Sequence, residues 1–188
     1  MNIVAPTPGI TAQIATAIDS FPTHWADRIR AFPGRIIAVM PNDKLTNYRP
    51  EERTRPGQLV HGLFCPHPTD SQLYLCNWLS AAQTTHTLTH ELSHVVDHLL
   101  VAQIPDAPTS YWSENDPEYL RITDALHARG RASTRYGLRD GCECFAETLA
   151  LLVESTDSSQ RARRRMPDLC AYLDRAVLAP PALVSVIL

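Results

Sequence analysis

The sequence has no apolar run long enough to cross a membrane and no excess of charge of one sign. Its 188 residues include 17 basic and 20 acidic side chains, for a formal net charge of −3. A transmembrane helix needs about 20 consecutive, mostly apolar residues, and a nucleic-acid-binding domain is typically strongly basic. We therefore predict no membrane span and no nucleic-acid partner.

Signals for secretion and for disulfide pairing are also missing. Residues 1–9 contain neither the basic region nor the apolar region of a secretory signal. The number of cysteines is odd and their spacing matches no metal-binding pair: Cys65, Cys76, Cys142, Cys144 and Cys170. Because reduced thiols are typical of the cytoplasm, we expect a cytoplasmic protein, with export by a non-classical or effector route as the alternative.

No internal repeat divides the chain, and its length suits one domain with a sizeable core. We predict a single domain over residues 1–188, with an N-terminal lobe over about 1–82 and a helical C-terminal lobe over about 83–188. The densest basic run is R-A-R-R-R, residues 161–165. A solvated helix face explains such a run better than a functional patch does.

Hydrophobic patterning predicts a few strands ahead of a mostly helical second half. Residues 1–31 are expected to be mostly helical, and R-I-I-A-V-M, residues 35–40, reads as a buried strand. Segments 58–65 and 72–79 are predicted to form a hairpin. The remaining expectations are surface loops at 41–57 and 103–116, helices at 117–128, within 135–154 and at 166–178, and an apolar tail at 180–188 that packs against the rest.

Residues 85–101 read T-H-T-L-T-H-E-L-S-H-V-V-D-H-L-L-V and contain a His-Glu-x-x-His motif on a helix. Its apolar residues form one helical stripe facing a core: Leu88, Leu92, Val95, Val96, Leu99 and Leu100. His90 and His94 lie about 40° apart around the axis and about 6 Å apart along it, so both can bind one metal ion. Glu91 projects beside them, where it can take a proton from a water without being a ligand. The motif predicts a zinc site.

A catalytic zinc has three protein ligands and one open position, so a third ligand is required. His98 lies about 12 Å along the helix from the first motif histidine, too far for both to bind one ion. Glu114 lies twenty residues after the second histidine, but within the loop-like S-E-N-D-P. Glu143 lies on a strongly predicted helix with Glu147 one turn further on, where it can orient a ligand histidine. We favour Glu143 and keep Glu114 as the alternative.

These motifs resemble those of a known family. His90-Glu91-Leu92-Ser93-His94-Val95-Val96-Asp97, with Tyr136 and Glu143-Cys144-Phe145-Ala146-Glu147, resembles the catalytic domain of anthrax toxin lethal factor and the related Pro-Pro endopeptidases. That family has His-Glu-x-x-His-x-x-Asp followed by Tyr-x6-Glu-x-Phe-Ala-Glu, and the spacing matches without a gap. The likeness spans about residues 58–178, and Ser93 departs from it because the family usually has glycine there.

The resemblance implies an α+β, zincin-like metalloprotease fold, with a small N-terminal sheet lobe, a mostly helical C-terminal lobe and the His-Glu-x-x-His helix between them. It implies the following roles: His90, His94 and Glu143 as zinc ligands, Glu91 as the general base, Tyr136 as the oxyanion donor, and Glu147 and Asp97 as supports of the ligands. Cys142 and Cys144 flank the ligand glutamate, and we expect them to pack rather than to bind metal.

An exposed edge strand beside a metal site can bind an extended peptide by main-chain hydrogen bonds. We predict that segment 73–79 is such a strand and that its first residues contact substrate: Leu73, Tyr74, Leu75, Cys76 and Asn77.

The predicted function is a monomeric, zinc-dependent endopeptidase that acts on a protein or peptide, with Glu91 activating a water. The alternative is a zincin-fold binding or regulatory module without useful activity. A deformylase is disfavoured, because deformylases place their cysteine ligand motif before the His-Glu-x-x-His motif.

Overall fold

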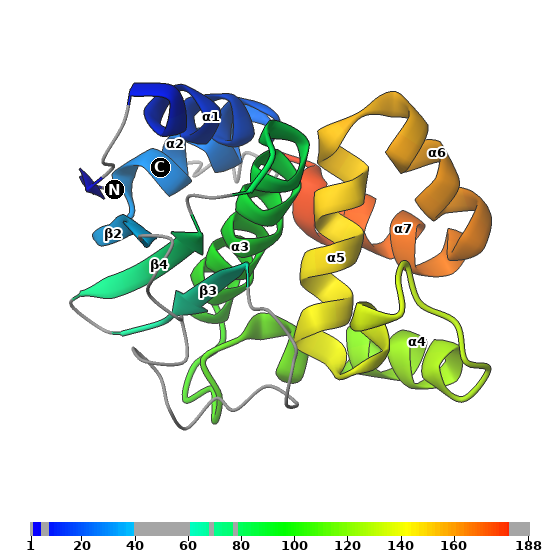
Figure 1. The fold of residues 1–188 in the computed structure, drawn as a ribbon. Helices are drawn as coiled ribbons and strands as arrows, with labels where there is room; N and C mark the ends of the chain where they lie inside the picture. Colours follow the sequence, from blue (N-terminus) through cyan, green and yellow to red (C-terminus); the bar gives the residue numbers. More distant parts are fainter. Residues whose placement is uncertain (1, 5–7, 40–60, 68–69, 77–78, 181–188) are drawn as a thin grey trace, which may run out of the picture.

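The computed structural model describes residues 2–4, 8–39, 61–67, 70–76 and 79–180, and it is a mostly helical α+β structure with a small sheet (Figure 1). The strands are β1 (Asn2–Val4), β2 (Gly34–Val39), β3 (Gly62–Cys65) and β4 (Ser71–Cys76). The helices are α1 (Pro8–Asp19), α2 (Thr23–Ala31), α3 (Ala81–Val101), α4 (Pro117–His127), α5 (Gly141–Glu154), α6 (Thr156–Arg165) and α7 (Pro167–Leu173). Three short helical turns complete it: η2 (Trp112–Glu114), η3 (Tyr136–Leu138) and η4 (Asp174–Leu178).

The four strands form one sheet in the order β1-β2-β4-β3. Strands β1, β2 and β4 run parallel, with Ile36 opposite Leu73, and β3 pairs antiparallel with β4, with Leu63 opposite Tyr74. The predicted hairpin and the predicted strand at 35–40 are confirmed, whereas β1 was not anticipated. The loop expected at 41–57 lies outside the described residues.

The prediction that segment 73–79 is an exposed edge strand is wrong. Strand β4 is hydrogen-bonded to β2 on one side and to β3 on the other. The side chains of Leu73, Tyr74, Leu75 and Cys76 are all buried, as expected for an unbroken apolar run in a strand covered on both faces. Asn77 lies outside the described residues. Within the described part of the chain, the edge strand beside α3 is β3 instead.

Helix α3 lies between the sheet and α5 (Figure 1). It begins four residues before the predicted stretch, because Ser80 caps it: the Ser80 side chain accepts from the Gln83 N–H, and the Gln83 side chain bonds the Ser80 N–H. Such a reciprocal capping box satisfies two backbone groups that the first turn leaves unpaired. Every residue from Thr87 to Asp97 is buried, so the motif residues lie in the interior.

An aromatic cluster joins the C-terminal elements to the helices around the motif. The Trp112 ring stacks on Tyr172, and Phe145 packs edge-on against Trp112 and Tyr119 with ring centroids 5.9 Å apart in each pair. The predicted helices at 117–128 and 166–178 are confirmed, the second as α7 followed by η4. The tail beyond residue 180 lies outside the described residues.

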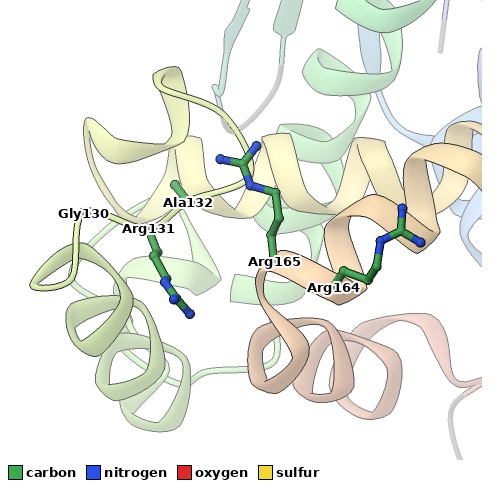
Figure 2. A pocket seen from close by; sticks show the side chains of 5 residues that line it. All are labelled: Gly130, Arg131, Ala132, Arg164 and Arg165. Atoms are coloured by element: carbon green, nitrogen blue, oxygen red, sulfur yellow. The ribbon is translucent and has the colours of Figure 1, made fainter.

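Helix α6 carries the arginine run, and all four of its arginines are exposed, as the solvated-face interpretation predicted. Arg131, Arg164 and Arg165 line a shallow hollow, but their guanidinium groups point in three different directions (Figure 2). They therefore do not converge on one ligand. Among the described residues, no helix has both the length and the apolar character needed to cross a membrane.

Replacing Phe145 by alanine should lower the free energy of unfolding by about 3–5 kcal/mol, because the ring is fully buried and a cavity would remain. Chemical denaturation of the two proteins measures the difference. Phe145→Leu keeps an apolar side chain in the cluster and should cost clearly less. Equal, small effects of both substitutions would contradict the packing described above.

Candidate metal centre and active site

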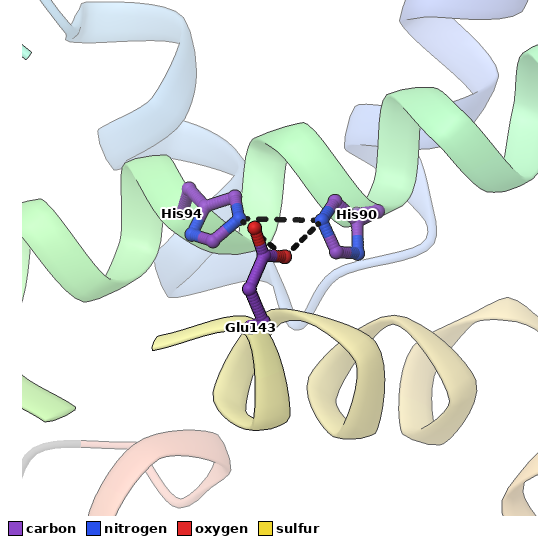
Figure 3. Close-up of side chains that lie close together, drawn as sticks. All are labelled: His90, His94 and Glu143. Carbon is purple, nitrogen blue, oxygen red and sulfur yellow. Dashed lines mark hydrogen bonds and ion pairs between the residues drawn. The ribbon is translucent and has the colours of Figure 1, made fainter. Parts of the chain in front are cut away.

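Three side chains bring metal-binding atoms together between α3 and α5 (Figure 3). His90 Nε2 lies 3.2 Å from His94 Nε2 and 3.2 Å from Glu143 Oε2, and His94 Nε2 lies 3.6 Å from the same oxygen. Zinc bonds of about 2.0–2.2 Å in a tetrahedron place neighbouring ligand atoms about 3.3 Å apart. The triangle matches that spacing, so these residues fit a zinc ion and could hold one.

Helix α5 starts where it does because of two hydrogen bonds that place Glu143. Asp140 caps the helix by accepting from the Glu143 N–H at 2.8 Å. The Tyr119 hydroxyl donates to the Gly141 backbone oxygen at 2.7 Å, so α4 holds the first turn of α5 in place. Glu143 therefore faces the two histidines from the N-terminal end of α5.

The His90 ring lies between two carboxylates, Glu143 at its Nε2 and Glu147 at its Nδ1, and both favour a positive charge on or next to the ring. Glu147 Oε1 lies 3.4 Å from His90 Nδ1, a charge contact outside hydrogen-bond geometry. Burial alone would lower the pKa of His90, but Glu143 and Glu147 raise it well above its ordinary value. Burial alone would raise the pKa of Glu143, but its contacts with His90 and His94 lower it far below the usual range.

Glu143 Oε2 has no hydrogen-bond partner among the described residues although it is buried. Its contacts with His90 and His94 at 3.2 and 3.6 Å leave it without a well-directed donor, which is costly for a buried ionised oxygen. A metal ion bound to this oxygen and to the two imidazoles would satisfy it. The sequence preference for Glu143 over Glu114 is consistent with this geometry.

Glu91 is buried directly beneath strand β3, beside His90 and His94. Its pKa is raised, first by burial and also by Glu143, while His90, His94 and the Phe64 backbone oppose the rise. A raised pKa is typical of a carboxyl group that accepts and returns a proton during catalysis. Its surroundings therefore suit the predicted role.

Gly62 on β3 makes room for Glu91, a role that was not predicted from the sequence. A Cβ atom at this position would lie 2.7 Å from both Cγ and Oε1 of Glu91 and 2.6 Å from Thr87 Cγ2. A glycine inside a strand often marks such a close approach. The glycine in H-G-L-F, residues 61–64 of the predicted hairpin, is therefore a signal from which this contact could have been predicted.

Tyr136 lies beside His90 and Glu143, on the short turn η3 that precedes α5. Its hydroxyl donates to Glu143 Oε1 at 3.1 Å, and its ring lies edge-on to His90 with centroids 5.9 Å apart. Burial and Glu143 raise the pKa of the phenol well above its ordinary value, and Arg139 opposes this. The hydroxyl therefore keeps its proton at neutral pH and can donate it.

The other residues considered from sequence lie away from the three donor atoms. Glu114 is exposed on η2, and the His98 ring bonds the Ser110 backbone oxygen at 2.9 Å. Asp97 accepts from the N–H and the hydroxyl of Ser113 at 2.8 and 2.6 Å, so it attaches η2 to α3. Its role in supporting a ligand histidine stays a prediction.

The two cysteines beside Glu143 are not part of the donor group found among the described residues. Cys144 is fully buried in the core, and Cys142 is partly buried. Burial raises the pKa of Cys144 to about 11 and raises that of Cys142 further. Both thiols therefore stay protonated at neutral pH, the form that is a poor metal ligand.

Comparison with solved structures finds a protein of similar fold. The structure of the Pro-Pro endopeptidase PPEP-2 from Paenibacillus alvei matches with a TM-score of 0.60, over 91% of this chain and 95% of that one, at 16% sequence identity. The chain has the fold of a Pro-Pro endopeptidase. The expected α+β architecture agrees with this likeness. No protein-family profile and no curated protein sequence matches the chain.

Replacing Gly62 by alanine should lower the free energy of unfolding by about 1–3 kcal/mol, because the added carbon overpacks against Thr87 and Glu91. Gly9→Ala is a matched control, since a Cβ atom there would meet nothing within 4 Å. Chemical denaturation compares the two variants. Equal stabilities would show that β3 does not lie this close to Glu91.

Proposed function

We propose that the chain is a zinc-dependent endopeptidase of the zincin type, with His90, His94 and Glu143 as the zinc ligands. The observation that carries the proposal is the triangle of two imidazole nitrogens and one carboxylate oxygen, with edges of 3.2, 3.2 and 3.6 Å. Two histidines and a carboxylate are a ligand set of catalytic zinc sites in peptidases. The fold likeness to a Pro-Pro endopeptidase supports a peptide as the substrate.

A zinc ion held by His90, His94 and Glu143 would acidify a water and polarise the substrate carbonyl. Glu91 accepts the proton of the attacking water on its carboxylate and delivers it to the leaving amine. The buried position of Glu91 suits this shuttle, because its raised pKa lets the carboxyl hold the proton between the two steps. The Tyr136 hydroxyl donates to the carbonyl oxygen as negative charge develops on it, a contribution of about 3–4 kcal/mol for a single donor of this kind.

The substrate is proposed to bind along β3, in place of the β4 segment suggested by the sequence. The Cys76 N–H donates to the His61 oxygen at 2.9 Å, and the bonding pattern alternates along an antiparallel pair. The backbone groups of Gly62 therefore face the side of β3 away from β4. Because Gly62 lies over Glu91, a peptide paired with it as an added strand passes across the general base.

The proposal predicts that Glu91→Gln lowers the rate of peptide cleavage by about 10²- to 10⁴-fold while bound zinc is retained, because the amide cannot accept the proton. A peptide library that includes Pro-Pro sequences, chosen because the neighbour in fold is named for them, supplies the substrate. Glu114→Gln, on the exposed η2 turn, is the matched control and should stay within about twofold of the wild type.

Two outcomes would count against the proposal. Equal cleavage by the wild type and Glu91→Gln would remove Glu91 from the mechanism. A zinc-loaded wild type that cleaves no library peptide, but binds one, would favour the binding module.

A further inference from the structure

The hydroxyl of Tyr136 is held by Arg139, a residue that the sequence patterns did not single out. Arg139 Nη1 donates to the Tyr136 hydroxyl oxygen at 2.9 Å, and its guanidinium carbon lies 5.0 Å from the centroid of the Tyr136 ring. That hydroxyl in turn donates to Glu143 Oε1 at 3.1 Å. The three residues form a chain of hydrogen bonds that ends at the donor cluster.

This chain determines where the tyrosine proton points. A guanidinium group can only donate, and a phenol has one proton to give. Because Arg139 occupies a lone pair of the Tyr136 oxygen, the proton is directed to Glu143, on the side of the candidate metal centre. A charged donor makes this a stronger hydrogen bond than a neutral donor would.

The backbone keeps Tyr136 and Arg139 together. They are the first residue and the C-cap of η3, and the Arg139 N–H donates to the Tyr136 backbone oxygen at 3.0 Å. Side chains three residues apart on such a turn eclipse one another. The Thr134 hydroxyl accepts from the Tyr136 N–H at 3.2 Å and so holds the start of the turn.

We propose that Arg139 is a positioning residue of the reaction, which holds the Tyr136 hydroxyl with its proton directed at the carbonyl oxygen of the bond being cleaved. The inference rests on the proposed function and deepens it. Arg139 acts through Tyr136 and does not itself touch the reacting atoms. Without it, packing against His90 still places the ring, but Glu143 Oε1 alone then holds the hydroxyl.

A double-mutant cycle on the zinc-loaded enzyme tests this coupling. Arg139→Met should lower kcat about tenfold, the scale of one hydrogen bond to a charged group, with KM changed less than about twofold. In the Tyr136→Phe background the same substitution should change kcat less than about twofold, because the hydroxyl it positions is gone. Arg139→Lys, which keeps a positively charged donor but not the planar guanidinium, should recover part of the loss.

Arg135→Met is the matched control, because Arg135 is exposed on the same loop and precedes Tyr136 directly. It should leave kcat and KM unchanged. An Arg139→Met effect of the same size in both backgrounds, or no effect at all, would overturn the inference. Bound zinc and circular dichroism of each variant exclude a loss of fold as the cause.

A second readout needs no peptidase activity. In protein labelled with ¹³C at tyrosine Cζ, the Tyr136 signal, assigned by its loss in Tyr136→Phe, should shift in Arg139→Met and not in Arg135→Met. If the wild type cleaves nothing, the proposed function and the catalytic role of Arg139 both fail, even where this signal shifts. If the wild type cleaves and neither kcat nor the signal responds to Arg139→Met, the inference alone is wrong.

Discussion

The packing of α5 against α3 is the constraint on which the rest of the structure depends. The His-Glu-x-x-His motif supplies two candidate ligand atoms from α3, and α5 packed against it brings the Glu143 carboxylate within 3.2 and 3.6 Å of them. The buried aromatic cluster around Phe145 packs α5 against η2 and α4, and η2 is joined to α3 by the hydrogen bonds from Ser113 to Asp97.

Burial gives the centre its chemical character. Glu91, Glu143 and Glu147 are largely removed from water within one small volume, together with two imidazoles. Three carboxyl groups in such a place need a positive charge among them, and a divalent metal ion would supply it. The same burial that favours a cation also raises the pKa of Glu91, so one physical cause acts on both the candidate metal site and the proposed base.

The sequence predicted the parts of this account that depend on local periodicity. The apolar stripe of α3, the hairpin and the helix carrying Glu143 and Glu147 follow from spacing along the chain. The position of β4 inside the sheet could not be predicted in this way, because strand order is decided by pairing between distant segments such as β2 and β4. Gly62 and Arg139 were missed for the same reason: each matters through a neighbour whose proximity only the folded chain creates.

The measurement that tests the central claim most directly is the zinc content of the purified protein, with wild type beside Glu143→Ala and Glu114→Ala. We predict about one zinc per chain in the wild type and in Glu114→Ala, and loss of tightly bound zinc in Glu143→Ala, because a catalytic zinc site needs its three protein ligands. Retention of zinc by Glu143→Ala together with its loss in Glu114→Ala would contradict the account, as would a wild type that binds no zinc on reconstitution.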